Sequence, residues 1–214
     1  MKTIRISNEN EMILEFLKGE LNSNRFNEKL ISILNELAYS SDIITNGDKG
    51  NQKENLLRLK IMEMYRGYPN KELFKNFPDI YEWKLVELSS EDIDNIYYID
   101  YDYWNELFNN TSKPIEAAKN IKNGVEIFDL SNKPFLDGIE YLKNKTFPPV
   151  ILIICNNEKF LIIEGHSRMT VYGFEPSKLQ GTYAYIGYCT PEDMKKYDAR
   201  MLKYESLKSR KYRW

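Results

Sequence analysis

The chain contains few of the residues that build metal and redox sites. Its 214 residues include two cysteines, Cys155 and Cys189, and a single histidine, His166. Two cysteines cannot form a disulfide framework or a cysteine-rich zinc site. One imidazole excludes multi-histidine metal sites and any mechanism that needs two. We therefore expect no metal site built from these residue types, and we expect Cys155, which lies in an apolar run, to be a buried thiol.

The sequence also lacks long apolar stretches. None approaches the roughly 20 residues that a membrane-spanning helix requires. The first residues, MKTIRISNENE, contain no apolar signal core. We therefore expect a cytoplasmic protein that does not associate with membranes.

Neither sign of charge is in large excess. The 30 lysines and arginines against 32 acidic residues give a formal net charge of -2. Proteins that bind nucleic acid over a broad surface carry a basic surplus, so binding of that kind is not expected. A local surplus does occur after Thr190, with eight basic residues against four acids. This basic tail is open to two interpretations, a nucleic-acid contact or, more commonly, a solvated helix face with a frayed end.

The hydrophobic content of 42% describes an ordinary globular protein whose length is sufficient for a core of its own. Apolar residues at helical spacing predict helices over 12–21, 26–38 and 56–62. Aromatic residues are dense between 70 and 111, where a short strand at 84–88 and a helix start at 89–92 are expected.

The second half of the chain has a different pattern. The apolar run at 150–155 is continuous, which is typical of a strand covered on both faces. We predict an α+β fold, with a mostly helical, aromatic-rich region at 1–110 and a small mixed-sheet domain at 111–214. The elements expected in that domain are strands at 125–128, 150–155, 160–163 and 182–188, and helices at 114–121, 135–142, 169–174 and 190–208.

The most informative segment is Glu164-Gly165-His166-Ser167-Arg168, which joins a predicted strand to a predicted helix. Backbone N–H groups at a helix start point outward with the positive end of the dipole behind them. Gly165 permits a tight turn and the close approach of a ligand, and Arg168 can bind a phosphate through two parallel hydrogen bonds. The pattern predicts an anion site, most simply for nucleotide phosphates. A structural interpretation stays open, with Ser167 as a helix cap and Arg168 paired with a carboxylate.

The run FLIIEGHSRMTVYG, residues 160–173, resembles the signature of the ParB-like/sulfiredoxin superfamily. Its members carry an apolar strand, then Asp/Glu-Gly-His-His/Thr/Ser-Arg, then a helix, and they include CTP-dependent DNA partition proteins, ATP-dependent sulfiredoxins and kinases of free serine. The resemblance covers about residues 124–200. It implies a pocket for ATP or ADP, with or without Mg²⁺, in which Gly165, His166, Ser167 and Arg168 hold the phosphates. Glu164 would be a base or a magnesium-linked carboxylate.

The motif departs from two branches of that superfamily. It lacks the Gly-Glu-Arg-Arg form of the partition proteins, and it lacks the cysteine at the turn that sulfinic-acid reduction needs. It looks closest to the kinase-like branch, which implies a phosphotransferase acting on a small hydroxyl compound. Such an enzyme needs a carboxylate to orient the acceptor. The candidate catalytic residues are Glu164, His166 and Glu126, although Glu126 is also consistent with a solvated carboxylate.

Two other functions remain open from the sequence. One is a DNA-linked module in which the turn is a nucleotide switch or a backbone contact. The other is a non-catalytic interaction protein that uses region 1–110. The aromatic and acidic stretch 96–104 has two interpretations as well, a pocket wall or a packing layer. The sequence leaves the oligomeric state open.

Overall fold

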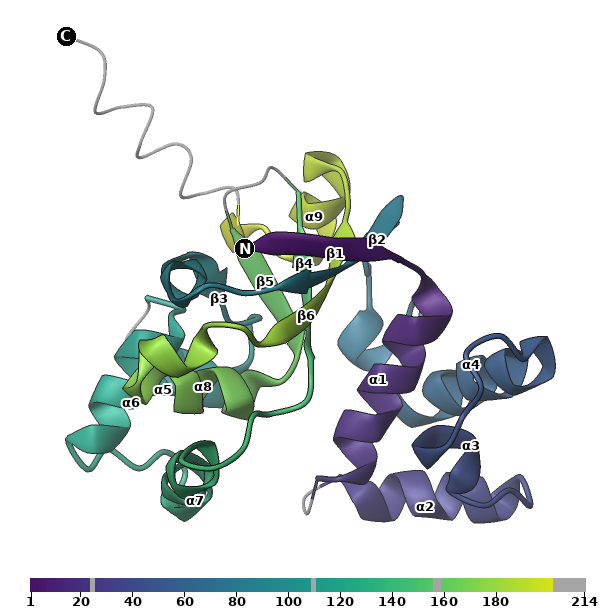
Figure 1. The fold of residues 1–214 in the computed structure, drawn as a ribbon, viewed down its shortest axis with the longest axis horizontal. Coiled ribbons are helices and arrows are strands. Elements are labelled where there is room, and N and C mark those ends of the chain that lie inside the picture. Colours follow the sequence, from purple (N-terminus) through teal and green to yellow (C-terminus); the bar gives the residue numbers. More distant parts are fainter. Residues whose placement is uncertain (24–25, 109–110, 156–158, 202–214) are drawn as a thin grey trace, which may run out of the picture.

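The computed structural model describes residues 1–23, 26–108, 111–155 and 159–201. It combines helices with one mixed sheet of six strands and confirms the α+β class (Figure 1). No helix in these ranges has the length and apolar character needed to cross a membrane.

The sheet has the strand order β1-β2-β6-β4-β5-β3. Neighbouring strands are antiparallel except for the pairs β4–β6 and β3–β5, which are parallel. Three strands belong to region 1–110 and three to region 111–214, so one sheet draws on both sides of the expected boundary. The strands are β1 (Lys2–Ser7), β2 (Glu82–Glu87), β3 (Ile96–Tyr97), β4 (Val150–Ile154), β5 (Phe160–Glu164) and β6 (Tyr183–Tyr188).

Two hydrophobic cores cover the two faces of the sheet. Alternate side chains of a strand point to opposite faces. In β4, Ile151 and Ile153 accordingly join the core beneath the first four helices, whereas Leu152 and Ile154 join the other core. This arrangement confirms the prediction of a strand buried on both faces over Val150–Ile154, whereas Cys155, expected to be a buried thiol, follows the strand and is half-buried. The helices of the first core are α1 (Glu9–Leu21), α2 (Asn27–Glu36), α3 (Asp42–Thr45) and α4 (Gln52–Arg66).

The second core is formed with later helices, which Figure 1 shows grouped beside the sheet on the side away from α1–α4. They are α5 (Asp102–Leu107), α6 (Pro114–Lys122), α7 (Lys133–Leu142) and α8 (His166–Phe174). The short helix α9 (Pro191–Tyr197) follows β6, and three 3₁₀ turns complete the fold: η1 (Glu72–Phe74), η2 (Ser90–Asn95) and η3 (Pro176–Leu179).

Two predicted elements differ from the structure: one strand is absent from the described residues, and one helix is shorter than expected. The strand expected at 125–128 is absent from the described chain, which has only an isolated bridge between Ile127 and Leu130. Phe128 and Asp129 adopt left-handed backbone angles, and these turn the segment back on itself. The helix expected at 190–208 begins as predicted, with the Thr190 hydroxyl accepting from the N–H of Asp193 at 3.2 Å, but it ends at Tyr197. Residues 202–214, with most of the basic tail, lie outside the described residues.

Asn51 gives a direct test of how α4 is held. Its side-chain oxygen accepts from the N–H groups of Lys53 at 3.1 Å and Glu54 at 3.3 Å. Asn51→Ala leaves both donors without this partner, so we expect the free energy of unfolding in urea to fall by about 1 kcal/mol. Asn35→Ala, at an exposed position of α2, is the matched control and should change stability by less than about 0.5 kcal/mol. Equal effects of the two variants would contradict a capping role.

Candidate functional site

The predicted strand, glycine and helix are present at the motif. β5 ends at Glu164, α8 begins at His166, and Gly165 between them has a φ of 101°. That left-handed conformation favours glycine. A Cβ atom at this position would also lie 2.6 Å from Cγ1 of Val150. The turn therefore requires glycine for both conformation and space.

Arg168 folds back across the turn and holds it closed. Its Nη1 donates to the carbonyl oxygens of Pro148 at 2.9 Å and Pro149 at 2.6 Å, and its Nη2 donates to Oε1 of Glu164 at 2.7 Å. These bonds tie the end of β5 to the segment before β4. They occupy three of the five N–H donors of a guanidinium group. Arg168 is thus paired with a carboxylate, as the structural interpretation expected. It could bind a phosphate through two hydrogen bonds only if some of these bonds opened.

Glu164 is held from a second side by α1. A Cβ atom on Gly19 would lie 2.7 Å from Oε1 of Glu164 and 3.3 Å from Nη2 of Arg168. The next residue, Glu20, is buried and accepts hydrogen bonds from Tyr65 and Arg66. Burial, and then the charge of Glu164, raises the pKa of Glu20.

Helix α1 therefore approaches the turn closely. The sequence did not predict this contact. An isolated glycine inside a helical pattern, here Gly19, is the one signal that marks such a close approach.

His166 lies beside a pair of stacked aromatic rings. Its imidazole stacks on Tyr98, with centroids 5.9 Å apart and planes at 11°, and on Trp104, at 5.4 Å and 17°. The residue as a whole is half-buried, but its Nε2 atom is buried and has no hydrogen-bond partner among the described residues. Burial, helped by the charge of Arg168, lowers the pKa of His166 to about 3. The ring is thus neutral at pH 7, and its orphaned nitrogen is an exception among buried polar atoms.

Two aromatic residues of the stretch 96–104, Tyr98 and Trp104, pack against α8. Tyr98 stacks on Trp104 at 4.6 Å and on Phe108 at 5.6 Å. The Tyr98 hydroxyl lies 2.7 Å from the hydroxyl of Thr170. The Thr170 hydroxyl in turn donates to the carbonyl oxygen of His166 at 2.8 Å. The packing interpretation therefore holds for Tyr98 and Trp104, whereas Tyr101 is exposed, and the second interpretation of the stretch as a ligand wall remains a prediction.

Two other predicted site residues, Ser167 and Glu126, do not take the roles expected from the sequence. Ser167 is exposed and is the second residue of α8, so it cannot be the cap; Gly165 occupies that position. Glu126 lies in the exposed loop between α6 and α7, where its Oε1 accepts from the N–H of Asn132 at 3.3 Å. In the described structure, no hydrogen bond or ion pair joins Glu126 to the motif. The turn therefore brings together residues 164–168 but not Glu126.

In the described ranges, no group of three or more His, Cys, Asp or Glu side chains is arranged to hold a metal ion.

Comparison with known proteins identifies no relative, since no family model, no curated protein and no solved structure matches the chain. The resemblance of residues 160–173 to the ParB-like/sulfiredoxin signature therefore remains a prediction from the motif.

Proposed function

We propose that the turn at residues 164–168 binds the phosphates of a nucleotide, with ATP or ADP as the expected ligand. The observation that carries the proposal is the buried, unpartnered Nε2 of His166 in the first turn of α8. Buried polar atoms are almost always hydrogen-bonded, and an exception of this kind is commonly completed by a ligand or a water molecule. A phosphate oxygen is a suitable acceptor for an imidazole N–H.

The backbone supports the same ligand. The first hydrogen bond within α8 runs from the N–H of Met169 to the carbonyl oxygen of Gly165 at 2.9 Å. The N–H groups of His166, Ser167 and Arg168 therefore precede the hydrogen-bonded part of the helix, at the positive end of its dipole. Gly165 removes the side chain that would otherwise stand beside them. Such an end of a helix favours a phosphate group.

The charges at the turn are nearly balanced before a ligand binds. His166 is neutral, and the positive charge of Arg168 is opposed by Glu164 at 2.7 Å. Binding of several phosphate charges would therefore be helped by a divalent cation. Mg²⁺ commonly combines phosphate oxygens with one or two carboxylates. Glu164 is the nearest carboxylate, but it is already in an ion pair, so we expect Mg²⁺ to be held mainly by the phosphates.

Phosphoryl transfer to a small hydroxyl compound extends this proposal. A base would take the hydroxyl proton while the acceptor oxygen receives the terminal phosphoryl group and ADP leaves. Glu164 fulfils that role only if Arg168 releases it, since its Oε1 already accepts the hydrogen bond from Nη2 of Arg168. The pairing makes Glu164 a positioning residue for Arg168 in the unliganded protein.

Titration calorimetry with ATP, ADP, CTP and GTP, each with and without Mg²⁺, tests the proposal. We expect one of these nucleotides to bind the wild type. His166→Phe keeps a stacking ring but removes both nitrogens, and it should weaken that binding at least tenfold. Ser167→Ala removes the exposed hydroxyl of the residue that follows His166, and it should weaken nucleotide binding several-fold. Ser177→Ala, at an exposed position of η3, is the matched control and should bind like the wild type.

Two results would overturn the proposal. Failure of all four nucleotides to bind the wild type would exclude a nucleotide site, and wild-type affinity in His166→Phe would exclude this turn. The single imidazole offers a second readout, because its NMR signal needs no assignment. Bound phosphate should raise the pKa of His166, since a nearby negative charge favours the imidazolium form.

A further inference from the structure

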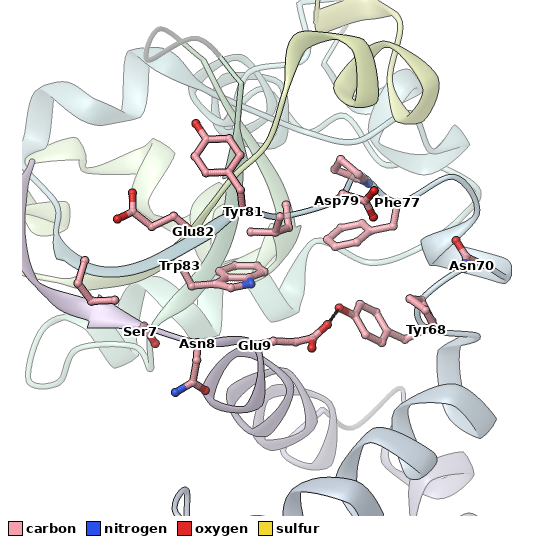
Figure 2. Close-up of a pocket in the computed structure, with 14 residues that line it drawn as sticks. Ser7, Asn8, Glu9, Tyr68, Asn70, Phe77, Asp79, Tyr81, Glu82 and Trp83 are labelled. Atoms are coloured by element: carbon pink, nitrogen blue, oxygen red, sulfur yellow. Dashed lines mark hydrogen bonds between the residues drawn. The ribbon is translucent and has the colours of Figure 1, made fainter.

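A cavity of about 760 Å³ lies at the end of the sheet opposite to the turn (Figure 2). The strand register shows this separation. Glu82, which lines the cavity, pairs with Tyr188, and Tyr188 pairs with Ile154 at the end of β4. Glu164 at the turn pairs with Ile151, near the start of the same strand. The cavity is therefore separate from the proposed phosphate site.

The lining of the cavity is aromatic and acidic. Four aromatic residues and three carboxylates contribute to its wall, and none of its 14 lining residues is Lys, Arg or His. Figure 2 shows Trp83, Phe77, Tyr68 and the carboxylate of Glu9 around one opening. The volume is in the range of small-molecule sites, about 300–1,000 Å³. The aromatic residues are Tyr68, Phe77, Tyr81 and Trp83, and the acidic residues are Glu9, Asp79 and Glu82.

Two of the carboxylates have no cation paired to them. Glu82 is neutralised by Lys84 at 2.8 Å. Glu9, by contrast, accepts a hydrogen bond from the buried hydroxyl of Tyr68, which is uncharged, and Asp79 is exposed at the rim. Neither Glu9 nor Asp79 forms an ion pair with any described residue, although the charge of Asp79 contributes to the raised pKa of Lys196. The opening therefore carries negative charge that no ion pair among the described residues cancels.

A buried polar group adds independent evidence for a ligand. Ser7 lines the cavity at the junction of β1 and α1, and only 9% of its surface is exposed. Its hydroxyl oxygen is buried and lacks a hydrogen-bond partner in the described structure. Most buried hydroxyl groups are bonded, so this atom has an unused capacity to accept a hydrogen bond.

We propose that this cavity binds a small organic cation, specifically a primary alkylamine with an apolar or aromatic body. Aromatic faces attract an ammonium group, and an unpaired carboxylate beside them adds direct charge attraction. The amine body would pack against Phe77 and Trp83, and its ammonium would lie at Glu9, within the field of Asp79. The hydroxyl of Ser7 provides a further acceptor for an N–H of the ligand. Anionic ligands are disfavoured by the same carboxylates.

The probes are 2-phenylethylamine and its uncharged counterpart 2-phenylethanol, titrated into the full chain by calorimetry. We expect the amine to bind at least tenfold more tightly than the alcohol. Glu9→Gln keeps an acceptor for the hydroxyl of Tyr68 but removes the charge. It should weaken amine binding about tenfold and leave alcohol binding unchanged. Asp79→Asn, at an exposed position, should weaken amine binding about threefold, and Glu140→Gln on α7 is the matched exposed control without effect.

Equal affinity for the amine and the alcohol would overturn the proposal, as would wild-type affinity for the amine in both Glu9→Gln and Asp79→Asn. Binding of a lysine-containing tripeptide without binding of 2-phenylethylamine would overturn the small-ligand class and identify a peptide site instead. The thermal midpoint of each variant, measured beforehand, separates loss of binding from loss of fold.

Discussion

Lowering the pH from about 7.5 to about 5 is expected to reduce the free energy of unfolding by about 2 kcal/mol through one side chain, His166. In the unfolded chain its imidazole takes up a proton near pH 6.5. In the folded protein, burial lowers the pKa to about 3. Between these values the unfolded state binds a proton that the folded state does not. The contribution of His166 is therefore fully present above pH 6.5 and is lost progressively as the pH falls toward 3.

The composition of the chain makes this effect easy to isolate. His166 is the only histidine, so no other side chain has an ordinary pKa in that interval. Glu20 acts in the opposite direction, because burial raises its pKa and its protonation favours the folded state. Glu11, whose pKa is lowered by a hydrogen bond from Arg5, adds to the loss of stability only at more acidic pH.

Urea unfolding followed by tryptophan fluorescence at several pH values measures the effect. His166→Phe is the control, since it keeps a ring beside Tyr98 and Trp104 but cannot titrate. We expect the change in stability over this interval to fall below about 0.5 kcal/mol in the variant. An unchanged pH dependence in His166→Phe would show that the imidazole is not held neutral by burial.

Arg168→Ala is expected to have the largest effect on stability, a loss of about 3 kcal/mol in urea unfolding. The substitution leaves the carbonyl oxygens of Pro148 and Pro149 without their donor. It also removes the cation beside Glu164. The carboxylate of Glu164 then lacks a counter-charge near Glu20, a buried residue whose pKa the charge of Glu164 already raises. Removing one member of a largely buried ion pair is costly because the partner charge remains unpaired.

An exposed ion pair supplies the control for Arg168. Lys133 lies 2.6 Å from Asp137 at the same spacing of four residues, but both side chains are mostly exposed. Lys133→Ala should therefore change stability by less than about 0.5 kcal/mol. Arg168→Lys should recover part of the loss, since an ammonium keeps the charge but not the planar set of donors. A loss below about 1 kcal/mol in Arg168→Ala would contradict the role of Arg168 in holding the turn.

This role affects how the proposed nucleotide site is tested. Loss of binding in Arg168→Ala would accompany a loss of stability, so that variant alone does not separate a ligand contact from a structural one. His166→Phe and Ser167→Ala leave the bonds of Arg168 to Pro148 and Pro149 in place. They are therefore the sharper variants for binding.

Several elements could be predicted from the sequence because their signals are local. Continuous apolar runs indicated β4 and β5, because a strand buried on both faces needs apolar side chains at successive positions. Thr190 indicated the start of α9, and Gly165 indicated the turn, because a cap and a left-handed residue depend on the chain within a few positions. The same local reasoning failed at 125–128, where left-handed backbone angles replaced the expected strand.

Other features depend on partners that lie far apart along the chain, and the sequence did not predict them. The strand β1 is an exposed edge, with Ile4 and Ile6 facing solvent, and it exists because Lys2 pairs with Glu87 far along the chain. The motif was visible in the sequence, but the charge state of His166 and the bonds of Arg168 were not. They are set by aromatic rings from α5 and its preceding segment, by the carbonyls before β4 and by the close approach of α1. Burial and charge pairing are properties of the assembled neighbours, and residue order alone does not specify which neighbours those are.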